Sequence, residues 1–134
     1  MKKLVILFSV LLSMQLFSQT PDPAFNPMTA PGSKGIHLSD HILFWQNPDS
    51  ISYNQLYFSE DSLLVANSDS SVRILNGFPS TVYTSFDLIN FGYLGDFVKY
   101  YWKVVEYNSS SNSLSPVWWF NSRPSFPFID FSFD

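Results

Sequence analysis

Two histidines, His37 and His41, have the side chains in this sequence that most readily bind a metal ion or act as a general base. Their spacing of four residues would align them on a helix, but on strands it only repeats along one edge. No carboxylate stands near them at the spacing of a metal ligand. The pattern therefore favours solvated or packed histidines over a metal pair or a general base.

Nucleophilic and acidic residues are scattered along the chain. There is no Gly-x-Ser-x-Gly segment, which presents the nucleophilic serine in α/β-hydrolases, and the many serines fit turns. A calcium site that combines Asp61 or Asp69 with backbone carbonyls is an alternative to solvated turn residues, but no alternating Asp-x-Asp-x-Asp loop supports it. We expect no catalytic residue, no bound metal and no cofactor.

The strongest functional signal is a set of aromatic residues expected on the outer face of one sheet. Exposed, clustered aromatic rings are unfavourable unless something covers them, so they would stack on sugar rings or contact a protein. The alternative is that Lys103 and neighbouring loops, or an adjacent domain, cover the rings. Ile42 and Phe44 are expected to face outward on the opposite sheet, where packing against another domain is the favoured explanation. The predicted aromatic patch consists of Tyr57, Tyr101, Tyr107 and Trp119.

Strands must hold these side chains in place. Residues 98–107 are almost all aromatic or β-branched, as in a strand that is packed on one face. Period-two alternation predicts that Tyr100, Trp102 and Val104 point inward and that Lys103 points outward. Further strands are expected at 34–38, 41–46, 53–59, 63–66 (a short edge strand), 72–75, 81–89 and 114–121.

Because no connection is long enough for a crossover helix, these strands predict an all-β fold. We expect an immunoglobulin-like antiparallel two-sheet sandwich of about seven strands, in which each sheet buries one apolar face against the other.

Composition limits the fold and the partners. The 134 residues have room for one domain; 19% are aromatic and 13% are charged, which favours aromatic strands joined by uncharged turns. The chain has no cysteine, so packing alone must stabilise it. The net charge of −4 and the lack of a Lys or Arg cluster argue against binding to nucleic acid.

The two ends of the chain differ from its middle. Residues 1–18 have the basic start and short apolar run of a secretory signal peptide, so we expect no stable membrane insertion after cleavage. Residues 19–33 form a Pro-rich linker. Residues 123–134 form a Phe-rich tail that looks like the start of a truncated following domain. Asn108 begins a glycosylation sequon, which matters only in a host with that machinery.

Several motifs stand in a characteristic order. They are Leu43-x-Trp45, Leu56-x-Phe58, Leu94 six residues before Tyr100, Trp102-x-Val104, and Trp118-x-Phe120 followed by Asn121-Ser122. Together they resemble a fibronectin type III domain of the secreted bacterial type over residues 27–122. The resemblance implies that Tyr100 is a corner tyrosine, with its ring in the core and its hydroxyl bonded to backbone near the preceding loop, and that Trp45 is the central core tryptophan.

The resemblance and the residues together predict a non-catalytic, secreted or cell-surface module. It would act as a spacer or as a protein interaction or adhesion domain whose partner is a neighbouring domain, an extracellular protein or a glycan. One alternative is a carbohydrate-binding accessory module of a secreted enzyme or adhesin that uses the predicted aromatic patch. Another is a fragment of an enzyme whose active site lies in sequence beyond this chain.

Overall fold

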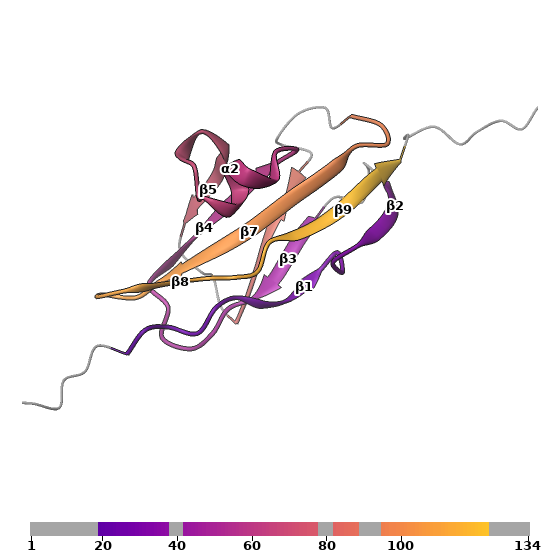
Figure 1. Ribbon diagram of the computed structural model, residues 1–134. Coiled ribbons are helices and arrows are strands. Elements are labelled where there is room, and N and C mark those ends of the chain that lie inside the picture. The colour runs from indigo at the N-terminus through magenta and orange to yellow at the C-terminus, as the bar shows by residue number, and fades with distance from the viewer. Residues whose placement is uncertain (1–18, 38–41, 78–81, 89–94, 124–134) are drawn as a thin grey trace, which may run out of the picture.

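Two packed β-sheets make up the protein, as predicted (Figure 1). The computed structural model describes residues 19–37, 42–77, 82–88 and 95–123, which form nine strands, one short α-helix and one 3-10 turn. The predicted signal peptide, His41 and all of the predicted tail except Arg123 lie outside the described residues.

The smaller sheet has three strands and the larger has six. The smaller has the order β1 (Phe25–Met28), β3 (Ile42–Gln46), β6 (Tyr83–Asp87). The larger has the order β2 (Ser33–His37), β9 (Trp118–Arg123), β7 (Lys99–Tyr107), β4 (Tyr53–Ser59), β5 (Arg73–Gly77), and β8 (Asn112–Leu114) pairs with β7. β1 therefore lies within the Pro-rich stretch 19–33, at an edge of its sheet, where a strand tolerates proline.

Alternation along the strands fills the space between the sheets as expected. Leu43 and Trp45 of β3 face Tyr100, Trp102 and neighbouring side chains of the larger sheet. Trp45 and Trp102 are fully buried, with ring centroids 6.2 Å apart. Trp102 also packs against Trp118 at 4.6 Å. The predicted inward faces of these strands are confirmed.

Tyr100 closes one end of the core. Its ring stacks on Phe58 at 5.0 Å, and its hydroxyl accepts a hydrogen bond from the backbone N–H of Gly95 (2.7 Å). The resemblance implies such a bond. A Cβ at Gly95 would lie 2.7 Å from Cγ2 of Val98, so a larger residue would require Val98 or the backbone to shift.

Three features differ from the prediction. The predicted strand 114–121 is divided into β8 and β9, with residues 115–117 in neither strand. The segment Leu63–Ala66 is not an edge strand but belongs to helix α2 (Ser62–Ala66), because the Asp61 carboxylate accepts hydrogen bonds from the N–H groups of Leu63 and Leu64 and so caps the helix. The sheets are also not wholly antiparallel, since β2 and β9 pair in parallel. Strands β3 to β8 lie between β2 and β9 in the sequence and connect them, so this parallel pair needs no crossover helix.

Candidate functional site

Tyr57, one member of the predicted aromatic patch, faces away from the inter-sheet core but is not available to a ligand. It is only 4% exposed, because α2 packs over this face and places Val65 in a second apolar cluster with Tyr57 and Val105. This matches the alternative in which neighbouring segments cover the rings.

Lys103 holds α2 against the larger sheet. Its Nζ donates hydrogen bonds to the carbonyl of Ala66 and the hydroxyl of Ser68, both at 2.7 Å, and lies 5.7 Å from the centroid of the Tyr57 ring. The ammonium thus satisfies a carbonyl at the C-terminal end of the helix. Burial lowers the pKa of Lys103.

The other three aromatic residues of the patch are partly exposed, and two of them, Tyr101 and Tyr107, pack against the cluster of Tyr57, Val65 and Val105. Tyr107 stacks on Tyr53 with centroids 4.5 Å apart and donates a hydrogen bond to Oε1 of Gln55 (3.0 Å). Burial, with Tyr57 and Tyr53 nearby, raises the pKa of Tyr107. Tyr101 and Trp119 flank Lys99, whose Nζ lies 5.1 Å and 3.9 Å from their ring centroids. Because Tyr57 is buried and the Lys99 ammonium lies over the rings of Tyr101 and Trp119, the four rings do not form one open platform.

The acidic residues considered for calcium shape the backbone instead. Asp61 caps α2, and the Asp69 carboxylate accepts hydrogen bonds from the backbone N–H and hydroxyl of Ser71 (2.9 and 2.6 Å), which lower the pKa of Asp69. Within the described ranges, no group of three or more His, Cys, Asp or Glu side chains is placed to hold a metal ion.

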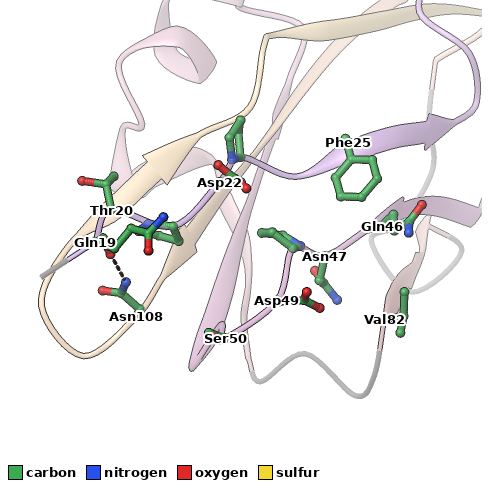
Figure 2. A pocket seen from close by; sticks show the side chains of 13 residues that line it. Gln19, Thr20, Asp22, Phe25, Gln46, Asn47, Asp49, Ser50, Val82 and Asn108 are labelled. Atoms are coloured by element: carbon green, nitrogen blue, oxygen red, sulfur yellow. Dashed lines mark hydrogen bonds between the residues drawn. The ribbon is translucent and has the colours of Figure 1, made fainter.

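The sequence did not reveal a cleft of about 620 Å³ at one end of the sandwich. Figure 2 shows Asp22 and Phe25 of the N-terminal segment on one side of it, and Asn47 and Asp49 on the other. Its volume falls in the range of small-molecule sites. The lining residues are Gln19, Thr20, Pro21, Asp22, Pro23, Phe25, Gln46, Asn47, Pro48, Asp49, Ser50, Val82 and Asn108.

Hydrogen bonds fix two walls of this cleft. On one wall the Asn108 side chain donates to the carbonyl of Gln19 (2.7 Å), a bond drawn in Figure 2, and accepts from the N–H groups of Ser110 and Ser111. Ser113 donates to the carbonyl of Asp22 (2.9 Å). These bonds fasten the N-terminal segment to the β7–β8 hairpin.

Asn47 anchors the opposite wall to a buried polar cluster between the sheets. Its Oδ1 accepts from Nε1 of Trp45 (3.0 Å), and its Nδ2 donates to Oγ1 of Thr84 (2.7 Å). Asn54, from the other sheet, donates to both Asn47 and Thr84 (3.2 and 3.3 Å). The polar cluster therefore ties the cleft wall to both sheets.

Glu106 lies opposite Asn54 in the β4–β7 pair and is fully buried. Neither of its carboxyl oxygens, nor Oδ1 of Asn54, has a hydrogen-bond partner among the described residues. Loss of solvent raises the pKa of Glu106 to about 8. Because the carboxyl oxygens are buried without a hydrogen-bond donor, the neutral form of Glu106 suits this position.

The outer face of the smaller sheet carries apolar side chains, as expected for Ile42 and Phe44, beside the polar side chains of Gln46, Ser85 and Asp87. Ile42 is 52% exposed, and Phe44 is half-buried against Tyr83, with ring centroids 5.1 Å apart. Met28 pairs with Phe44 across β1 and β3 and is exposed. We call Met28, Ile42, Phe44 and Tyr83 the outer apolar face.

Comparisons with known proteins do not assign a family. No protein-family model matches this chain, and no curated protein shows significant similarity to it. Within the described residues, no helix combines the length and the apolar character needed to cross a membrane.

Proposed function

We propose that this protein is a secreted, non-catalytic interaction module of the fibronectin type III kind, whose partner is a neighbouring domain or an extracellular protein. The signal-peptide pattern of residues 1–18 supports secretion. The two-sheet architecture and the hydrogen bond between Tyr100 and Gly95 support the resemblance.

The outer apolar face is the main structural support for a role in binding a partner. An antiparallel sheet with one face on the core usually presents polar side chains on its other face. Here Ile42, Tyr83 and Met28 are all exposed on the side away from the core. Contiguous apolar surface of this kind marks interaction sites.

The chemistry of this face favours a polypeptide partner. Methionine and aromatic residues are enriched at the centres of protein interfaces, whereas charged residues are depleted there. Asp87, which pairs with Ile42, and Gln46, which pairs with Tyr83, provide the polar rim. The alternative of a carbohydrate-binding module that uses the predicted aromatic patch has less support, because Tyr57 is buried and the Lys99 ammonium lies over the rings of Tyr101 and Trp119.

Photo-crosslinking from the outer apolar face tests the proposal. We expect p-benzoylphenylalanine in place of Ile42 to form a covalent adduct with one extracellular protein or neighbouring domain, identified by mass spectrometry, when the full chain is produced in its host. Tyr83→Lys should abolish the adduct, because an ammonium would be buried at the contact.

A second photoreactive position provides the matched control. Leu63 is an apolar residue that is 70% exposed on α2, over the larger sheet. The same label in place of Leu63 should give no such adduct. Equal labelling from both positions, no adduct from Ile42, or an adduct with a second copy of this chain would contradict the proposal.

A further inference from the structure

We propose that the end cleft binds neutral sugar residues of an oligosaccharide. The site is distinct from the predicted aromatic patch, and the inference does not depend on the function of the outer apolar face. The lining includes side chains that both donate and accept hydrogen bonds, together with two carboxylates and one aromatic ring.

The polar groups of the cleft match sugar hydroxyls, which are both donors and acceptors. Gln46 and Gln19 have amides, Thr20 and Ser50 have hydroxyls, and Asp22 and Asp49 have carboxylates that only accept. Hydrogen bonds from hydroxyls to carboxylates are charge-assisted and stronger than neutral ones. No Lys, Arg or His is among the described lining residues. The cleft therefore favours a neutral ligand over an anionic one.

Phe25 provides the apolar part of the site. Its side chain is 40% exposed and lies on the wall formed by the N-terminal segment (Figure 2). An exposed ring in a polar cleft gives a flat apolar surface for the C–H face of a pyranose, whose rim carries the hydroxyls. A lone cationic side chain from a partner would use the carboxylates but would leave most of the amides and hydroxyls unused.

The walls are held in place before a ligand arrives. Asn47 is bonded into the polar cluster between the sheets, and its N–H donates to the carbonyl of Val82 (2.7 Å). On the other side, Asn108 and Ser113 hold the backbone at Gln19 and Asp22, so the side chains of Thr20 and Asp22 are not needed to position that segment. A pre-organised cleft loses less conformational entropy on binding.

Binding of defined oligosaccharides to the purified full chain tests the inference. We expect at least one of cellotetraose, maltotetraose, mannotetraose and chitotetraose to bind, measured by saturation-transfer NMR and isothermal titration calorimetry. Asp49→Asn should weaken that binding about tenfold, as expected for loss of a charge-assisted hydrogen bond. Phe25→Ala should weaken it by at least as much.

The opposite end of β7 offers matched controls. Asp96→Asn and Phe97→Ala change an exposed aspartate and a phenylalanine that is 70% exposed, outside the cleft lining. Both should bind sugar like the unaltered chain, and thermal melts should show that all four variants fold. The inference is overturned if none of the oligosaccharides binds, if the controls weaken binding as much as the cleft variants, or if only a lysine-rich peptide binds.

Discussion

At the scale of single residues, Glu106 links the interior of the sandwich to the pH of the surroundings. Burial raises the pKa of its carboxyl group from the ordinary 4.5 to about 8 in the folded protein. Between these values the folded state keeps a proton that the unfolded state has released. Stability therefore falls as pH rises through this window, with a slope of up to about 1.4 kcal/mol per pH unit, and this contribution is constant below 4.5 and above 8.

We predict that Glu106→Gln removes this part of the pH dependence. Glutamine stays neutral at every pH and keeps the size of the glutamate side chain. Urea unfolding at pH 5 and pH 8 should show a clearly smaller difference in the free energy of unfolding for the variant than for the unaltered chain. Glu60→Gln, in an exposed turn, serves as the control and should keep the original dependence. Unaltered protein that is equally stable at both pH values would show that Glu106 is ionised in the folded state.

At the scale of elements, helix α2 determines which aromatic rings reach solvent. We predict that Asp61→Ala lowers the free energy of unfolding by about 1 kcal/mol, because two N–H groups of the first turn lose their acceptor. Local opening of α2 can be measured by hydrogen exchange of the Val65 amide and by the fluorescence of an environment-sensitive dye that binds the exposed face of the larger sheet. Glu60→Ala is the neighbouring control and should change stability by less than half as much. If both variants behave alike, the cap does not determine the stability of α2.

The error at α2 shows where sequence patterns are ambiguous. Four apolar or small residues in a row at Leu63–Ala66 fit a short strand as well as a helical turn, and periodicity cannot separate these readings. The available signal was Asp61 two residues before the run, which is typical of a helix N-cap. Longer strands were predictable, because the alternation in β3 and β7 continues for several residues and places Trp45 and Trp102 on inward faces.

The end cleft was not predictable from such patterns. Its walls come from the N-terminal segment, the turn after β3, the residue before β6 and the β7–β8 hairpin. Turn residues have no periodicity that specifies which segments meet in space. The buried polar cluster beneath the cleft was not predictable either, since Thr84 lies 37 residues from Asn47 in the sequence and each member resembles an ordinary surface residue.

At the scale of the whole molecule, burial of indole rings between the two sheets is expected to dominate stability. We predict that Trp102→Ala costs about 3 to 5 kcal/mol of unfolding free energy, because it leaves a cavity between Trp45 and Trp118. Trp119→Ala, on the outer face of the same sheet, should cost clearly less, since that ring is only half-buried. Urea unfolding followed by circular dichroism measures both, and equal losses would mean that the inter-sheet core does not determine stability.

The parallel pairing of β2 with β9 has a mechanical consequence. If the chain is pulled from its two ends and the contacts of the N-terminal segment and of β1 with β3 have yielded, tension acts on β2 at its first residue and on β9 at its last. The paired strands are then dragged in opposite directions along their shared length. The hydrogen bonds between them, together with the one from the N–H of Gly32, just before β2, to the carbonyl of Trp119 (2.8 Å), then bear load together instead of breaking one at a time. A module built in this way would resist stretching.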